Sequence, residues 1–161
     1  MNEINEIKKA CESMKSAVNT AFDRLILLLG SKDATGLPME YVYLFTANTH
    51  IFIGTKPAAV LFGEERAEAD NWRKIFAAIM SKCNSDAQCH ENLMYLLDKI
   101  SGRDRILLSR SPDSMRRPLR IDEDMYAEVS YGTATLLYIL RDRILAPANF
   151  DYSGISIVLK I

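Results

Sequence analysis

The first thirty residues carry the most regular pattern of apolar and polar positions in the chain. Apolar or small side chains recur at alternating intervals of three and four residues, at Ile4, Ile7, Cys11, Met14, Val18, Ala21, Leu25 and Leu28. This is the a and d spacing of a heptad repeat, so we predict one long amphipathic helix that ends at Gly30. Its stripe either covers the sheet of its own domain or pairs with a second copy of the chain. For a homodimer through this helix, Glu3 and Lys8 would occupy a g position and the following e position, an attractive pair between parallel helices.

The next segment alternates between strand-forming and helix-forming residues. Four elements are predicted, with strands at 41–45 and 51–53, a helical turn at 58–62 and a helix at 65–82. Ser85 and Gln88 have the spacing of a capping box, which predicts a second helix ending near Ile100. About three residues would join the two helices, a spacing that resembles a helix-turn-helix.

The remaining elements are strands at 105–109, 117–121 and 125–131, a helix at 133–145 and a strand at 155–161. The fold class is therefore α+β. We expect a long N-terminal amphipathic helix, a small antiparallel sheet, a central helix pair and a C-terminal helix–strand unit. A length of 161 residues fits a single α+β domain over residues 1–161.

Total charge gives no signal for a nucleic acid or a membrane, because 20 basic residues face 21 acidic ones. The arginines are unevenly placed, however, since eight of the eleven lie between Arg103 and Arg143. Residues 101–121 hold six arginines against Asp104 and Asp113, a local balance of +4.

This arginine-rich segment is the best candidate binding site, because the planar guanidinium can grip a phosphate or carboxylate with two hydrogen bonds. Coming after the helix pair, it is predicted to be a hairpin in the place of the wing of a winged-helix domain. Its partner would be nucleic acid or an acidic protein surface. The candidate binding residues are Arg103, Arg105, Arg110, Arg116, Arg117 and Arg120, with Gln88 and Asn92 on the preceding helix.

An acidic run just downstream allows two other interpretations. Asp122, Glu123, Asp124 and Glu128 sum to −4 and would neutralise the arginines if their strands were antiparallel neighbours. The chain would then be a protein–protein interaction module, either a homodimer or an inhibitor or immunity-type partner that binds no nucleic acid. The third interpretation is a metal-dependent nuclease that uses Asp122, Asp124 and Glu128, although no lysine occurs between Lys99 and Lys160 to orient a water molecule.

No catalytic residue, metal site or cofactor is expected, and an enzyme is the less favoured reading. His50, His90, Cys83 and Cys89 do not have the spacing of metal ligands. An odd number of irregularly spaced cysteines favours reduced thiols and a cytoplasmic location. The start lacks the pattern of a secretory signal, and no apolar run approaches the length that spans a bilayer, so no membrane partner is expected.

Several short motifs lie in the second part of the chain, residues 72–161. They are Trp72-Arg73, Gly102-Arg103-Asp104-Arg105, Arg117-Pro118-Leu119-Arg120-Ile121 and Tyr126-Ala127-Glu128, followed by the predicted helix and strand. The segment resembles a small α+β module of uncharacterised proteins in prokaryotic defence and mobile-element neighbourhoods. The resemblance covers a little over half the chain and implies a bacterial or phage-type cytoplasmic accessory protein. It implies no activity and no site.

Overall fold

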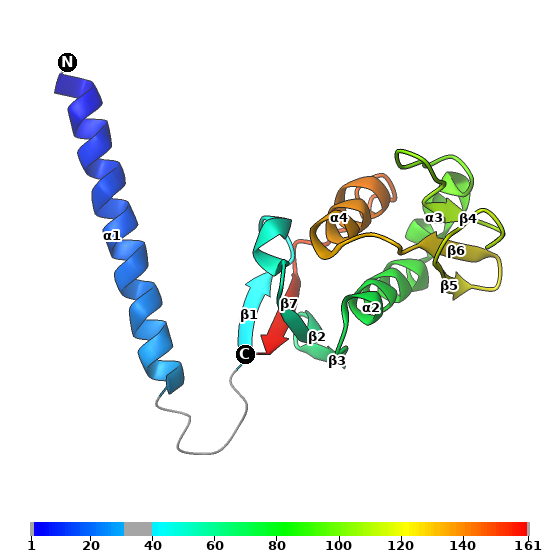
Figure 1. Ribbon diagram of the computed structural model, residues 1–161, viewed down its shortest axis with the longest axis horizontal. Coiled ribbons are helices and arrows are strands. Elements are labelled where there is room, and N and C mark those ends of the chain that lie inside the picture. Colours follow the sequence, from blue (N-terminus) through cyan, green and yellow to red (C-terminus); the bar gives the residue numbers. More distant parts are fainter. Residues whose placement is uncertain (1, 31–39, 161) are drawn as a thin grey trace. The chain divides into compact units, whose positions relative to one another are not determined.

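The computed structural model describes residues 2–30 and 40–160 of the chain. Contacts divide the chain into two units, Met1–Met39 and Glu40–Ile161, which we describe separately (Figure 1). The first unit contains helix α1 (Asn2–Gly30), which confirms the helix predicted from the heptad spacing. That the whole chain forms one domain stays a prediction.

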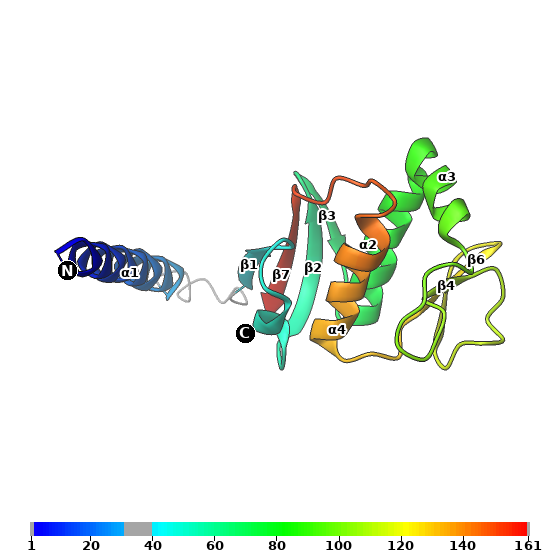
Figure 2. The ribbon, with the colours of Figure 1, turned by 90° about the horizontal axis from the view of Figure 1, so that it is seen from above.

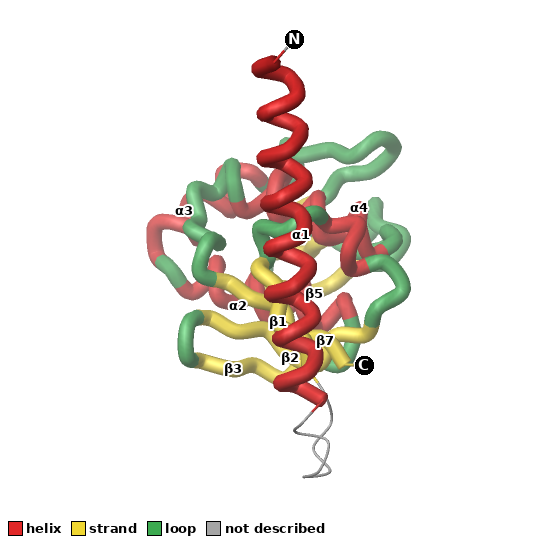
Figure 3. The backbone as a smooth tube through the Cα atoms, turned by 90° about the vertical axis from the view of Figure 1, so that its left-hand side faces the viewer, coloured by secondary structure: helices red, strands yellow, loops and turns green. Residues whose placement is uncertain are grey.

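A four-stranded antiparallel sheet forms one side of the second unit (Figure 3). Its strands are β1 (Glu40–Leu44), β7 (Ile155–Lys160), β2 (Lys56–Phe62) and β3 (Glu65–Glu68), in that spatial order. Strand β7 pairs with both β1 and β2, so the C-terminal strand lies inside the sheet and the first strand of the unit lies beside it at the edge.

Helices cover one face of this sheet, as Figure 2 shows. They are α2 (Trp72–Ser85) and α4 (Thr133–Tyr138), and α4 continues as a π-helix, η3 (Ile139–Leu145). Alternate residues of β7 face them, because successive strand side chains point to opposite faces. Ile155, Ile157 and Leu159 are buried there in one core with Phe76 and Ile79 of α2.

A second, smaller sheet lies on the far side of these helices, beside α3 (Ala87–Leu96) (Figure 2). Its strands are β4 (Leu108–Ser109), β6 (Met125–Glu128) and β5 (Pro118–Asp122), in that spatial order. Strand β6 lies in the middle and pairs with both neighbours, so β4 and β5 do not pair with each other.

The α+β class is confirmed, and the helix at 133–145 and the strand at 155–160 lie where the sequence predicted them. Three predictions in the first half are wrong, and two of them concern the chain around Gly63. Residues 58–62 belong to strand β2 rather than to a helical turn, and residues 65–68 form strand β3 rather than the start of a helix. The cause is the turn at Gly63, whose φ of 64° lets β2 fold back on β3 as a two-residue hairpin.

Local side-chain hydrogen bonds explain the other boundary errors. The predicted strand at 51–53 lies largely within a 3-10 helix, η2 (Thr49–Phe52), whose first turn is capped when Asn48 accepts a hydrogen bond from the His50 N–H. Asp86, and not Ser85, caps α3, because its carboxylate accepts the Cys89 N–H at 2.9 Å. Asp86 alone therefore joins α2 to α3.

On the outer face of the larger sheet, an ion pair joins the two edge strands. Arg66 on β3 forms a two-pronged bridge to Glu40 on β1, with N–O distances of 2.9 and 3.0 Å, and also contacts Glu68. Val158, at the centre of this face, is only 1% exposed. The hydrogen bonds from Arg66 lower the pKa of Glu40 and raise that of Arg66 itself.

We expect the substitution Arg66→Ala to lower the free energy of unfolding by about 1 kcal/mol, because it removes the bridge and the aliphatic cover of the outer face. Since the pKa of Glu40 is lowered in the folded state, the bridge stabilises the protein at neutral pH and this contribution is lost as the pH falls through that pKa.

Urea unfolding at pH 7 and at pH 3.5 measures both effects. Lys74→Ala is the matched control, because Lys74 pairs with Asp70 on an exposed helix surface. Equal losses in the two variants would contradict the covering role of Arg66.

Candidate functional site

The loop of residues 110–117 is held in place by one buried carboxylate. Glu128 of β6 is fully buried, and its two oxygens accept the backbone N–H groups of Arg116 at 2.7 Å, Arg117 at 2.9 Å and Ser130 at 3.1 Å. Burial by itself would raise the pKa of Glu128, but these hydrogen bonds outweigh it and the pKa is lowered. The loop backbone is therefore tied to the sheet through an ionised carboxylate.

The rest of the acidic run contacts other elements. Asp122 accepts a hydrogen bond from the Asn84 side chain at 2.9 Å, which is the main cause of its lowered pKa. Asp122, Glu123 and Asp124 line a cavity of about 180 Å³ together with His90 and Met94 of α3. The acidic turn thus lies beside α3 and is held by neutral side chains and backbone groups.

None of the six candidate arginines forms an ion pair with a carboxylate within residues 2–30 and 40–160. Arg120 lies nearest to the acidic turn, where it donates to the backbone carbonyl of Asp122 at 3.4 Å. Arg105 is half-buried and donates to Ser130 at 3.0 Å, so it supports the fold. Exposed side chains belong to Arg103, Arg110, Arg116, Arg117 and Arg120.

The predicted arginine hairpin is wrong, because strands β4 and β5 lie on opposite sides of β6. Residues 110–117 instead cross from one edge of the small sheet to the other. The reason is that β6 offers pairing partners on both sides, with Ala127 opposite Leu108 and also opposite Leu119. The segment therefore does not have the geometry of a wing hairpin.

A cavity of about 430 Å³ brings Arg117 together with Arg73, a residue that the sequence analysis did not single out as a binding residue. Arg73 lies in the first turn of α2 and donates one hydrogen bond to the Pro118 carbonyl at 3.0 Å, which fixes its guanidinium beside β5. Tyr131 and Thr133 add hydroxyl groups to the lining, and burial raises the pKa of Tyr131. Two guanidinium groups with two hydroxyls form a set of donors for an anion.

The two polar residues predicted on α3 have different surroundings. Asn92 is half-buried and donates to the Ala148 carbonyl at 2.8 Å, so its amide supports the loop after the π-helix. Gln88 is exposed and donates to Asn92 at 3.4 Å. Of the two, only Gln88 presents its side chain at the surface.

The carboxylates of the nuclease interpretation do not form one site. Glu128 is occupied by backbone donors, whereas Asp122 lies in the turn beside α3. Among the residues that the structure describes, no group of three or more His, Cys, Asp or Glu side chains is placed to hold a metal ion. Nothing in this arrangement favours metal-dependent cleavage.

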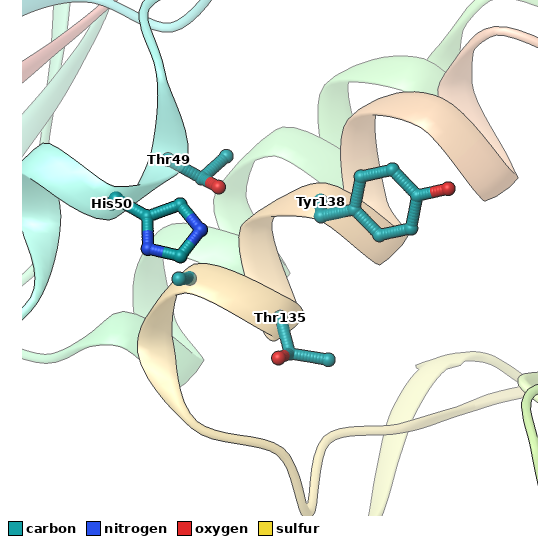
Figure 4. A pocket seen from close by; sticks show the side chains of 5 residues that line it. Thr49, His50, Thr135 and Tyr138 are labelled. Carbon is teal, nitrogen blue, oxygen red and sulfur yellow. The ribbon is translucent and has the colours of Figure 1, made fainter.

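A smaller cavity of about 200 Å³ is lined by Thr49 and His50 from η2 and by Thr135 and Tyr138 from α4 (Figure 4). In Figure 4 the Tyr138 ring extends away from the His50 ring. His50 and the two threonine hydroxyls form no mutual hydrogen bond in the described structure, so the geometry shows no activated nucleophile there.

The chain was compared with protein families, curated proteins and solved structures, and it matches none of them. The resemblance to the module of defence neighbourhoods therefore stays an expectation. In the described part of the chain, no helix is both long enough and apolar enough to cross a bilayer.

The substitution Glu128→Gln should lower the free energy of unfolding by about 3 kcal/mol. One carboxylate oxygen becomes an NH₂ group, which turns a donor toward the N–H of Arg116 or Arg117 and leaves it unpaired in the interior. Because the pKa of Glu128 is lowered on folding, the wild type should also lose this stability as the pH falls through that pKa, and the variant should not.

Urea unfolding of both proteins between pH 3 and pH 7 tests this expectation. Glu123→Gln, in the exposed turn of the same run, serves as the control. A Glu128→Gln protein as stable as the wild type at pH 7 would contradict the anchoring role.

Proposed function

We propose that this chain is a non-enzymatic accessory protein that binds nucleic acid through the loop 110–117 and the adjoining cavity. One observation carries the proposal. Arg110, Arg116 and Arg117 are exposed and form no ion pair in the described structure, although four acidic residues follow them in the sequence. Internal neutralisation was the main argument against an anion-binding surface, and the observed contacts do not support it.

The anchored backbone favours binding for an entropic reason. Ordering a loop on binding costs free energy, and a loop that is already tied at Arg116 and Arg117 has less freedom to lose. The carboxylate oxygens of Glu128 accept hydrogen bonds from backbone N–H groups in the interior and pair with no guanidinium group in the described structure. The arginines can therefore contact phosphate without first breaking an ion pair.

The cavity between Arg73 and Arg117 would hold one phosphate group of the bound strand. Its volume of about 430 Å³ lies within the range of small-ligand sites. Two guanidinium groups can each give a phosphate two hydrogen bonds, which lysine cannot do. The exposed loop arginines would contact neighbouring phosphates.

The near-neutral net charge limits the expected affinity and specificity. A chain with a formal net charge of −1 has no long-range field that attracts a polyanion, so recognition must be local. Few phosphates would be neutralised, and binding should be moderate and readily reversed by salt. Moderate, salt-sensitive binding suits an accessory role. We also propose a bacterial or phage-type cytoplasmic location, which the three free cysteines support.

The triple substitution of Arg110, Arg116 and Arg117 to alanine should weaken binding and reduce its salt dependence. Each phosphate contact contributes about 0.9 to the slope of log K against log salt, so the slope of the variant should be less steep by about 2 to 3. Fluorescence anisotropy with labelled single- and double-stranded DNA and RNA, measured between 25 and about 200 mM salt, gives both quantities.

The control removes the same number of positive charges elsewhere, at Lys9, Lys56 and Lys160, all of which are exposed. Its slope should stay close to that of the wild type. If the arginine variant binds as the wild type does, the proposal is wrong. If the wild type does not bind nucleic acids but binds polyglutamate through the same arginines, the partner is an acidic protein surface instead.

Single substitutions separate the cavity from the loop. Arg73→Ala should weaken binding about tenfold, a loss typical of one charge-assisted contact, and Arg73→Lys should restore only part of it because lysine lacks the planar fork. Thermal unfolding of both variants shows whether the loss of the hydrogen bond to Pro118 changes stability instead. Full binding by Arg73→Ala would remove the cavity from the proposed site.

A further inference from the structure

Helix α1 exposes an apolar stripe that its own unit does not cover. Taken by itself, the helix leaves Ile4, Ile7, Met14 and Val18 between 62% and 69% exposed. These residues occupy four of the first five a and d positions of the heptad repeat, and Cys11 occupies the other. A helix of 29 residues with such a stripe gains most of its stability by packing the stripe against another surface. The stripe therefore requires a partner.

The larger sheet is a poor partner, because the centre of its outer face is already closed. The bridge between Arg66 and Glu40 links the two edge strands, and Val158 and Ala59 on the strands between them are buried. Val42 and Leu44 of the edge strand β1 remain exposed there, at 57% each. A docking helix would have to displace an ion pair for limited apolar contact.

The length of the stripe also exceeds the size of the sheet face. From Ile4 to Leu28 the stripe is about 36 Å long at 1.5 Å per residue. The longest strand of the sheet has seven residues, or about 23 Å, and four strands are about 14 Å across. Even along its diagonal of about 27 Å, the sheet face is shorter than the stripe. The sheet face therefore could not cover the whole stripe.

We infer that α1 pairs with α1 of a second copy of this chain as a parallel, in-register, two-stranded coiled coil. The stripe is self-complementary, since a and d positions of one helix pack against the same positions of an identical partner. Ile4 and Val18 at a positions favour two strands where leucine occupies d, as at Leu28, whereas Ile7 at d favours a higher oligomer, so the mass in solution is part of the test. This inference rests on α1 and the outer sheet face, and is independent of the proposed function.

Charge decides the direction of the second helix. In a parallel pair, Glu3 at g faces Lys8 at the following e position of the partner helix, and this attraction occurs twice by symmetry. In the antiparallel pair that aligns the whole stripe, core layers join residues whose numbers sum to 32. The flanking e positions then face each other with numbers that sum to 30, which places Lys15 beside its own copy. The parallel arrangement thus gains two attractive pairs, whereas the antiparallel one contains a repulsive contact.

Cys11 reports the register directly, because it occupies an a position. In the parallel coil each Cys11 faces the other Cys11, whereas the antiparallel alignment places it opposite Ala21. Cys83 and Cys89 do not interfere, because both are buried. Burial raises the pKa of Cys83 to about 12 and also raises that of Cys89, which keeps both thiols protonated.

The experiment uses the full chain under mild oxidation with copper phenanthroline, followed by non-reducing electrophoresis. The wild type should convert mostly to a covalent dimer, and Cys11→Ser should remain monomeric on the gel. Two matched variants in the Cys11→Ser background test the seam. Met14→Cys, at a d position, should cross-link, and Lys9→Cys, at an outward f position, should not.

Sedimentation equilibrium of the reduced proteins gives the mass in solution. The wild type should have twice the chain mass of 18.2 kDa at tens of micromolar. Lys8→Glu should weaken the dimer, and the exchange Glu3→Lys with Lys8→Glu should restore it. A wild-type monomer overturns the inference, a trimer overturns the two-stranded form, and a dimer without the Cys11 cross-link overturns the parallel direction.

Discussion

The buried carboxylate of Glu128 is the contact on which the surroundings of the arginine loop depend. A charged group in the interior is stable only when its hydrogen bonds are complete, and Glu128 meets this condition with three backbone N–H groups. Two of these belong to the loop that crosses the small sheet. The contact therefore occupies the oxygens of this carboxylate with backbone N–H groups and leaves the guanidinium groups of the loop without an ion pair in the described structure. It also keeps the crossing loop against β6, where Arg117 reaches the cavity shared with Arg73.

The elements that the sequence predicted well are those with long, regular patterns. Helix α1 follows from its heptad spacing, and β7 follows from the apolar residues Ile155, Ile157 and Leu159 at alternate positions. The errors occur where one or two residues decide the chain path. Gly63 converts a predicted helical region into a hairpin through a positive φ, and Asp86 rather than Ser85 begins α3. Such decisions depend on single hydrogen bonds and dihedral angles, which periodicity does not record.

The candidate site was predictable only in part. Composition located the arginine cluster, but counting charges suggested that Asp122–Glu128 would neutralise it. The count was misleading because carboxylates can be satisfied by amides and backbone groups, as Asn84 does for Asp122 and the loop backbone does for Glu128. Arg73 was missed for a different reason. It lies about 45 residues from Arg117 in the sequence, and only the packing of α2 against β5 brings them together. Its neighbour Trp72 drew attention to the segment, but not to a binding role.

The position of β7 in the centre of the larger sheet has a consequence for synthesis of the chain. Glu40 pairs with Lys160, which follows it by 120 positions, and β2 pairs with the same strand. Contacts of such long sequence separation form slowly, because a large loop must close before any pairing compensates for the lost entropy. The sheet cannot close until β7 has left the ribosome. Until then β1 has no partner strand, and β2 lacks a partner on the edge that faces β7. The unpaired edges of β1 and β2 are therefore the part of the incomplete chain most in need of protection from aggregation.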